Sequence, residues 1–241
     1  MTATQPDDAP VLAADTWRSN AELIADVAKL GYLKADYRTL DPTYGLGVFW
    51  RRWRPDDLVA CDLDPAKSPL GRSVDFTNLP WPAGSFSAVV LDPPYKLNGT
   101  PTADIDARYG VDEREHWRDR LDLIERGIAE CARVLRPGGT FLLKCADQVC
   151  SGQIRWQTDE FSHHAAAVGF RKVDRFDMLG HARPQPRGRR QVHARGRGST
   201  LLVFERLASS LTRNGAPADE GAATSPTHPL RNKERSSDEV T

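Results

Sequence analysis

Short apolar runs alternate with helix-like stretches between about residue 17 and about residue 207. Apolar residues recur at helical spacing over 20–30 and over about 121–135, and a shorter helix is expected over 160–168. Ser19 or Asn20 can cap the first of these helices. Strands are expected in a segment ending near Asp41, at 58–61, briefly before Asp75, and at 86–91, 140–144, 170–176 and 199–205. This alternation predicts an α/β fold with a mostly parallel sheet.

The two ends of the chain differ from this central part. Residues 1–15 are polar and contain proline, and residues 208–241 have too little apolar content to offset the entropy of ordering them. We therefore expect disordered segments at 1–15 and 208–241 around one domain at 16–207. A chain of 241 residues is long enough for one domain with a sizeable core.

Composition indicates a soluble protein but does not identify its binding partner. The formal net charge is +0 and the hydrophobic fraction is 39%, which is typical of a soluble globular protein and does not by itself indicate nucleic acid. The N-terminus lacks the basic and apolar regions of a signal peptide, and no apolar run is long enough to span a bilayer. We therefore expect a cytoplasmic protein without a membrane partner.

The cysteines do not form a pattern typical of metal binding. None of the four lies in a CxxC pair, and they stand at Cys61, Cys131, Cys145 and Cys150. Because unpaired cysteine mostly behaves as a small apolar residue, buried reduced thiols are favoured over a disulfide or a metal site.

Acidic residues followed by glycine or proline end several of the expected strands. The first such end is the glycine loop, Asp41-Pro42-Thr43-Tyr44-Gly45-Leu46-Gly47. Ligands of open α/β sheets bind beyond the carboxyl ends of strands, and glycine lets backbone approach a ligand closely. The third glycine of the dinucleotide fingerprint is missing, so a ligand without a pyrophosphate fits better than NAD, although a plain tight turn is the alternative.

Two further acidic strand ends suggest an adenosyl group. Asp62 could accept both hydroxyls of a ribose, or it could be a helix N-cap. Asp75 offers an acceptor for an adenine amino group beside the aromatic face of Phe76, or the two could be a turn aspartate and a core phenylalanine.

The fourth acidic strand end is the clamp segment, Asp92-Pro93-Pro94-Tyr95. It is expected by chance in a chain of this length only about once in a thousand at ordinary residue frequencies. Proline fixes φ, lacks an N–H and pushes the preceding residue to extended geometry, which predicts a stiff rod presenting carbonyls without competing donors. A rigid turn with a core tyrosine is the alternative.

An exocyclic amine of adenine or cytosine is a poor nucleophile, because its lone pair is delocalised into the ring. The Asp92 carboxylate and the Pro93 carbonyl could hold both amine protons, favour a pyramidal nitrogen and stabilise the positive charge that grows during attack. Tyr95 could stack on a base taken out of the helix. The clamp segment therefore predicts methylation of a base amino group.

These residues resemble the class I, Rossmann-like S-adenosylmethionine-dependent methyltransferases, and among them the nucleic-acid amino-methyltransferases with an (Asp/Asn/Ser)-Pro-Pro-(Tyr/Phe/Trp) motif. The resemblance runs from about Trp17 to Leu207, including the turn at 134–139. It implies that the glycine loop, Asp62, Asp75 and Phe76 bind S-adenosylmethionine. It also implies a seven-stranded, mostly parallel sheet with helices on both faces and an antiparallel C-terminal strand. We expect no separate target-recognition domain, so sequence specificity would come from short loops or be absent.

An arginine-rich stretch joins the last two expected strands. It lies at 181–199, contains no acidic residue, and carries Arg183, Arg187, Arg189, Arg190, Arg195 and Arg197. Clustered arginine releases counterions from a nucleic-acid backbone, so a phosphate-binding loop is favoured over a merely solvated one.

The sequence thus predicts a methyltransferase acting on adenine N6 or cytosine N4, with DNA favoured over RNA and no metal. An RNA base methyltransferase, acting for example on guanine N2, is the second hypothesis. A third is a nucleic-acid-binding module that has kept the fold and lost catalysis.

Overall fold

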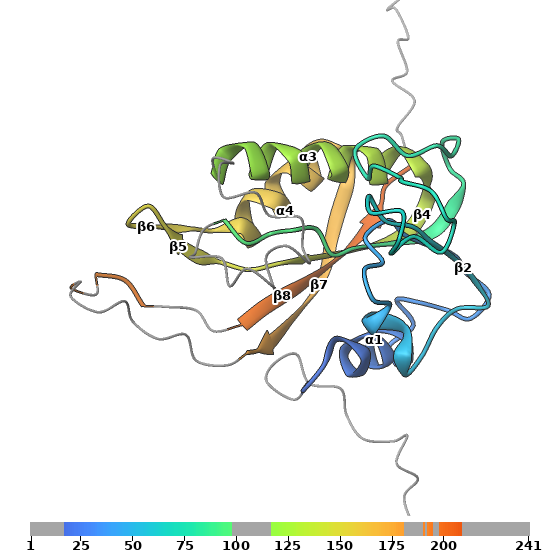
Figure 1. Ribbon diagram of the computed structural model, residues 1–241, viewed down its shortest axis with the longest axis horizontal. Helices are drawn as coiled ribbons and strands as arrows, with labels where there is room; N and C mark the ends of the chain where they lie inside the picture. The colour runs from blue at the N-terminus through green and yellow to red at the C-terminus, as the bar shows by residue number, and fades with distance from the viewer. Residues whose placement is uncertain (1–16, 98–116, 181–189, 191, 195–197, 209–241) are drawn as a thin grey trace, which may run out of the picture. The chain divides into compact units, whose positions relative to one another are not determined.

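The computed structural model describes residues 17–97, 117–180, 190, 192–194 and 198–208 (Figure 1). The chain divides into two units, Met1–Ser209 and Ser210–Thr241, and the second lies outside the described residues. The expected disordered ends therefore lie outside them as well. No described helix is both long and apolar enough to cross a membrane.

The described helices and strands follow one another in an alternating order. They are α1 (Asn20–Lys29), β1 (Arg38–Asp41), the short 3-10 helix η2 (Val48–Arg51), β2 (Asp57–Ala60), β3 (Phe86–Leu91), α3 (Trp117–Val134), β4 (Leu135–Cys145), β5 (Gln148–Cys150), β6 (Gln153–Arg155), α4 (Gln157–Ala167), β7 (Phe170–Leu179) and β8 (Gly198–Arg206). The three expected helices and six of the seven expected strands are confirmed.

The main sheet has the strand order β2-β1-β3-β4-β8-β7. Strands β2, β1, β3 and β4 pair in parallel, and β8 is antiparallel to both β4 and β7. The predicted α/β class and the antiparallel C-terminal strand are confirmed. The predicted count of seven strands is wrong, because the sheet formed by the described residues has six.

The missing strand is reduced to one parallel bridge between Asp62 and Ser73. Directly after it, the Asp75 carboxylate accepts hydrogen bonds from the backbone N–H and the hydroxyl of Thr77, both at 2.8 Å. Such a side-chain turn competes with strand pairing, and it bends the chain before a ladder can form.

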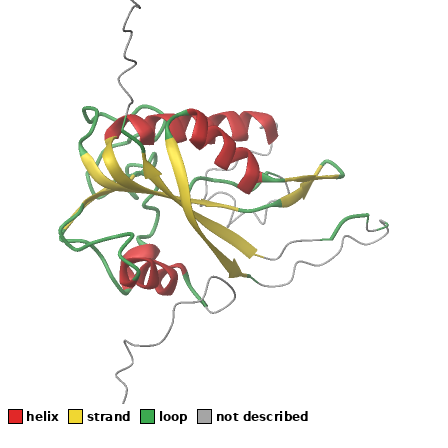
Figure 2. Ribbon diagram, turned by 180° about the vertical axis from the view of Figure 1, so that it is seen from behind, coloured by secondary structure: helices red, strands yellow, loops and turns green. Residues whose placement is uncertain are grey.

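Helices cover both faces of the sheet, as predicted (Figure 2). On β3, Ala88 and Val90 belong to the core cluster of α1, whereas Val89 and Leu91 belong to the cluster of α3 and α4. Successive side chains of a strand point to opposite faces, so a continuous apolar run such as β3 supplies both cores. Strand β3 is completely buried and fixes the clamp segment at its end.

A small antiparallel hairpin of β5 and β6 was not predicted from the sequence. Each strand has three residues, and the connecting Ser151 and Gly152 both have positive φ, at 51° and 77°. Two consecutive positive φ values are typical of the tight hairpin turn that fits twisted strands. The Ser-Gly pair was the signal that could have revealed the hairpin.

The four cysteines are free thiols and are buried, as predicted. Burial raises the pKa of the Cys61 thiol to about 12, and it also raises the pKa values of Cys131 and Cys145. The neutral thiols serve as small core residues.

Candidate functional site

Three acidic residues meet at one edge of the sheet, because their strands are parallel neighbours. Asp41 is the last residue of β1, Asp62 follows β2 by two residues, and Asp92 directly follows β3. Burial, assisted by the nearby charges of Asp92 and Asp62, raises the pKa of Asp41 to about 7. The strand ends therefore gather the acidic groups at the carboxyl edge, where such sheets bind ligands.

Both carboxylate oxygens of Asp41 accept hydrogen bonds from the protein itself. It is 4% exposed, and its carboxylate accepts hydrogen bonds from the Thr43 backbone N–H at 3.0 Å and from the Trp50 indole N–H at 2.7 Å. These two bonds lower its pKa against the larger effect of burial. Asp41 thus holds the start of the glycine loop in place.

The glycine loop bends over the end of β2. The backbone N–H of Gly45 donates to Asp62 Oδ2 at 2.8 Å, and Gly45 and Gly47 have φ values of 56° and 63°. A Cβ on Gly47 would lie 2.5 Å from the hydroxyl of Tyr44. The tyrosine ring covers Gly47, so the loop requires glycine both for its backbone and for its space.

Asp62 is half-buried, and no helix begins at it, so the helix N-cap interpretation is wrong. Its Oδ1 accepts the backbone N–H of Asp64 at 2.9 Å, and its Oδ2 accepts the N–H of Gly45. Each carboxylate oxygen can accept more than one hydrogen bond. The group is thus fixed in orientation and keeps acceptor capacity for a ligand with two hydroxyls.

Asp75 and Phe76 differ in exposure. Asp75 is exposed at the turn with Thr77, whereas Phe76 is 8% exposed and packs against α3. A Cβ on Gly127 of α3 would lie 2.4 Å from the Phe76 ring. Phe76 is therefore a core residue and does not offer the open aromatic face that the sequence suggested.

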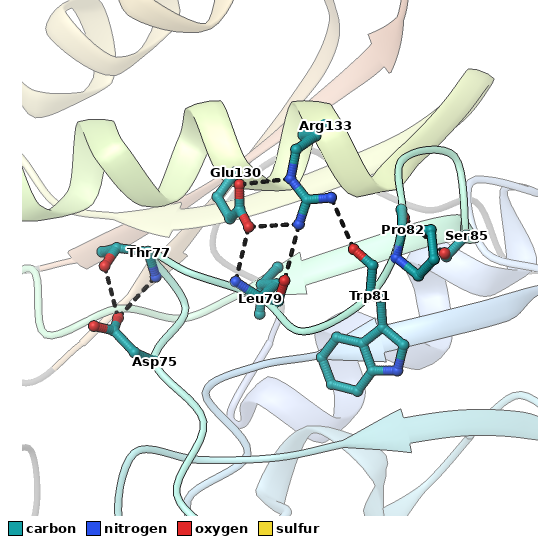
Figure 3. A network of polar contacts seen from close by, with 8 residues as sticks. All are labelled: Asp75, Thr77, Leu79, Trp81, Pro82, Ser85, Glu130 and Arg133. Carbon is teal, nitrogen blue, oxygen red and sulfur yellow. Dashed lines mark hydrogen bonds and ion pairs between the residues drawn. The ribbon is translucent and has the colours of Figure 1, made fainter.

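Glu130 and Arg133, an ion pair on α3, hold the loop after Asp75 by hydrogen bonds to its backbone (Figure 3). The Arg133 guanidinium donates to the carbonyls of Leu79 and Trp81 at 2.9 and 2.7 Å, and Glu130 accepts the backbone N–H of Leu79 at 2.8 Å. The hydrogen bond from Arg133 lowers the pKa of Glu130. These contacts fix the segment between Asp75 and β3.

Asp92 contrasts with the other two acidic strand ends. Its backbone N–H donates to the Thr43 hydroxyl at 2.8 Å, which joins the clamp segment to the glycine loop. Its half-buried carboxylate makes no hydrogen bond with any residue that the structure describes. Burial raises the pKa of Asp92 to about 6, and the charge of Lys144 opposes this rise. The carboxylate thus remains available to a ligand.

The carbonyls that follow Asp92 have protein donors, so the prediction of a rod without competing donors is wrong. The Tyr95 backbone N–H donates to the Pro93 carbonyl at 2.7 Å, which closes a three-residue turn. The Pro94 carbonyl accepts from Arg120 at 3.3 Å. The Pro93 oxygen keeps a second lone pair, so its predicted acceptor role is still chemically possible.

Two buried glutamines hold the end of the clamp segment. The Tyr95 carbonyl accepts hydrogen bonds from Gln148 Nε2 and Gln157 Nε2, both at 2.8 Å. Gln148 Oε1 also accepts the backbone N–H of Leu97 at 3.1 Å. Gln157 is fully buried and Gln148 is 8% exposed. Sequence reasoning missed both, because nothing in a lone glutamine signals burial.

Lys144 lies buried at the end of β4 and is 1% exposed. Its ammonium donates to the Asn20 side-chain carbonyl at the start of α1 and lies 5.7 Å from the centre of the Phe49 ring. Burial lowers its pKa, and the Asp92 charge opposes that effect.

Most of the arginine-rich stretch lies outside the described residues, including Arg183, Arg187, Arg189, Arg195 and Arg197. Within it the structure describes Arg190, which is exposed, and residues 192–194. His193 Nε2 lies 3.0 Å from the carbonyl of Gly152, so the stretch touches the turn between β5 and β6. Over the described part of the chain, no three His, Cys, Asp or Glu side chains gather as metal ligands.

No protein-family model matches this sequence, and no curated protein matches it. Among solved structures, the cyclase SpnF is 17% identical with a TM-score of 0.47, covering 77% of this chain and 81% of its own. CalS10, an amino pentose methyltransferase from Micromonospora echinaspora, is 17% identical with a TM-score of 0.47, covering 78% and 92%.

A third solved structure is TTHA0409 from Thermus thermophilus, a candidate DNA modification methylase in complex with S-adenosylmethionine. It is 18% identical with a TM-score of 0.38, and the match covers 54% of this chain and 49% of that protein. This chain thus matches about half the length of that protein. At these identities and scores, the similarities add nothing beyond the strand order already described.

Proposed function

We propose that this protein is an S-adenosylmethionine-dependent methyltransferase that transfers a methyl group to an exocyclic amino group of a nucleic-acid base, adenine N6 or cytosine N4 in DNA. The observation that carries the proposal is the Asp92 carboxylate. It is half-buried beside two other acidic strand ends and makes no hydrogen bond with a described residue. An acceptor held at such an edge without a protein partner suits a ligand that donates hydrogen bonds.

The residues around the glycine loop fit S-adenosylmethionine. Asp62 is fixed by Gly45 and Asp64 and keeps acceptor capacity for the two ribose hydroxyls. Asp75 is exposed further along the chain, and its carboxylate can accept a hydrogen bond from the adenine amino group. The bound cofactor supplies an electrophilic methyl group on a sulfonium. Asp41 lies further inside and shapes the loop without contacting the ligand.

In this proposal the clamp segment prepares the amine. The Asp92 carboxylate and the free lone pair of the Pro93 carbonyl each accept one amine proton, which favours a pyramidal nitrogen whose lone pair points away from both acceptors. The methyl group would come from S-adenosylmethionine held by the glycine loop and Asp62, leaving a neutral thioether, and the Asp92 carboxylate would take the proton that the methylated amine releases. The negative charge of Asp92 stabilises the positive charge that develops on nitrogen.

The ionised state of Asp92 depends on its surroundings. Burial alone would favour the protonated acid, which cannot accept from an amine through both oxygens. Lys144, buried at the end of the neighbouring strand β4, lowers the pKa of Asp92. Lys144 thus keeps the clamp charged near neutral pH.

Transfer of labelled methyl from S-adenosylmethionine to duplex DNA, single-stranded DNA and ribosomal RNA tests the proposal. Labelled N6-methyl-2′-deoxyadenosine or N4-methyl-2′-deoxycytidine would support it. Label on guanine N2 of RNA would favour the second hypothesis instead. A protein that binds the cofactor and DNA but labels no polymer would be a binding module, and the proposal would be wrong.

A further inference from the structure

We infer that Thr43 is a positioning residue, whose hydroxyl holds the backbone of Asp92 in place relative to the glycine loop and thereby aims the target amine at the methyl donor. This inference rests on the proposed function and adds a residue that acts through Asp92. It gives the Thr43 side chain a different role from the cofactor contact that the sequence suggested.

The hydroxyl of Thr43 joins two strand ends that lie 49 residues apart in the chain. The Asp92 backbone N–H donates to Thr43 Oγ1 at 2.8 Å. Thr43 follows the end of β1 by two residues, and Asp92 directly follows β3. Because β1 and β3 pair in parallel, the bond connects the start of the glycine loop to the start of the clamp segment.

This hydrogen bond continues the register of the two strands by a side chain. The pairing of β1 with β3 ends at Leu40 opposite Val89, and the same offset places Thr43 opposite Asp92. Pro42 has no N–H and cannot extend a strand ladder. The Thr43 hydroxyl thus supplies an acceptor to Asp92 beyond the point where the backbone ladder stops.

The backbone around Thr43 is itself fixed by the protein. The N–H groups of residues 43–45 donate in turn to the Asp41 carboxylate, the Cys61 carbonyl and the Asp62 carboxylate, at 3.0, 3.0 and 2.8 Å. A short, fully bonded stretch of backbone therefore lies between the group that would accept the ribose hydroxyls and the group that would accept the amine. The offset between the two is set by Thr43.

The position of the Asp92 carboxylate depends on this backbone contact. The carboxylate makes no hydrogen bond with a described residue, so no side-chain partner fixes its place. Threonine is branched at Cβ and therefore stiff about χ1, which suits a side chain that must hold one position. Reacting groups need accurate placement, and an error of about 1 Å can cost about 100-fold in rate.

The first test is methyl transfer to DNA by Thr43→Val, which has nearly the same shape but no acceptor for the Asp92 N–H. Its kcat should fall by about 10- to 100-fold, because the acceptor of the amine is displaced, while its affinity for S-adenosylmethionine stays close to that of the wild type. Thr43→Ser keeps the hydroxyl and should recover most of the rate. Thr140→Val, at a half-buried site on β4, is the matched control and should behave like the wild type.

A second measurement does not depend on methyl transfer. S-adenosylmethionine carries a positive sulfonium, whereas its product S-adenosylhomocysteine is neutral. If Asp92 is aimed at the donor, S-adenosylmethionine should lower the pKa of Asp92 from about 6 by more than S-adenosylhomocysteine does. Carbon-13 NMR of the Asp92 carboxyl against pH measures both shifts. Their difference should shrink in Thr43→Val and persist in Thr43→Ser; Lys144 and Asp41, whose charges also act near this carboxylate, are the same in every protein compared.

Three results would overturn the inference. The first is a wild-type kcat in Thr43→Val. The second is loss of cofactor affinity in that variant with kcat unchanged, which would make Thr43 a cofactor contact. The third is an equal effect of the two cofactor forms on the pKa of Asp92 in the wild type, a result that needs no variant to fold.

The inference and the proposed function can fail separately. A wild-type protein that methylates DNA, together with a Thr43→Val variant that does so at the same rate, contradicts only the inference. A wild-type protein that shows the larger effect of S-adenosylmethionine on Asp92, reduced in Thr43→Val, and yet labels no polymer contradicts only the proposed substrate. A protein that binds neither cofactor form contradicts both.

Discussion

Replacing Gln148 and Gln157 by leucine, singly and together, tests whether the clamp segment is held by two equivalent donors. Gln157→Leu removes the 2.8 Å bond to the Tyr95 carbonyl and the 3.4 Å bond from the Ala146 N–H. Each single variant leaves the Tyr95 carbonyl the hydrogen bond from the other glutamine, also at 2.8 Å. We expect each to lower the free energy of unfolding by about 1–3 kcal/mol, the usual effect of removing one partner of a buried hydrogen bond.

The double variant should cost more than the sum of the two single variants. It leaves the carbonyl between two apolar side chains with neither glutamine donor, so a desolvation penalty of about 1–3 kcal/mol appears only there. Urea unfolding of all four proteins, followed by circular dichroism, measures this coupling. Gln153→Leu is the matched control, because Gln153 is exposed on β6 and its replacement should stay within about 0.5 kcal/mol of the wild type.

Additivity of the two single effects within about 0.5 kcal/mol would refute the reasoning, because it would mean that the glutamines do not share a partner. The same variants connect stability to chemistry. The Tyr95 carbonyl lies in the clamp segment and not in the glycine loop, so the double variant should lose methyl transfer while its affinity for S-adenosylmethionine changes little.

Two further substitutions test the charge of the clamp and the shape of the glycine loop. Lys144→Met removes the charge that lowers the pKa of Asp92. Because the carboxylate must be ionised to act, the acid limb of the pH–rate profile should move from about pH 6 to higher pH. An unmoved limb would show that Lys144 does not control the pKa of Asp92. Gly47→Ala should destabilise the fold by more than Gly71→Ala in urea unfolding, since both have φ near 65° but only a Cβ on Gly47 meets the Tyr44 ring. The left-handed backbone alone costs roughly 1–2 kcal/mol for alanine, and equal losses in the two variants would exclude the contact with Tyr44.

The sequence revealed most of the sheet because its strands stop abruptly. Strands β1 and β3 end at Asp41-Pro42 and at Asp92-Pro93, where proline and a turn-forming acid prevent continuation. The strand expected before Asp75 is shorter, with Val74 as its apolar residue. A local side-chain turn was enough to prevent a strand there, and periodicity cannot detect that competition.

The roles of the acidic strand ends were harder to predict. In sequence, Asp41, Asp62 and Asp92 each stand at the end of an expected strand and precede a turn. Only the fold shows that the Asp41 carboxylate accepts a hydrogen bond from Trp50, nine residues ahead, whereas the Asp92 carboxylate accepts none from a described residue. Which of these carboxylates is bonded to the protein depends on tertiary contacts, as does the burial of Gln148 and Gln157.

The most direct test of the central claim is methyl transfer by Asp92→Ala and Asp92→Asn, measured beside the affinity of each variant for S-adenosylmethionine. The account predicts that Asp92→Ala abolishes transfer. Asp92→Asn, which keeps one acceptor oxygen but no charge, should lose roughly 100- to 1,000-fold, the usual effect of removing one such electrostatic contact. Cofactor affinity should stay close to that of the wild type in both. Transfer at the wild-type rate in Asp92→Ala, or loss of cofactor binding in its place, would contradict the assignment of Asp92 as the acceptor of the target amine.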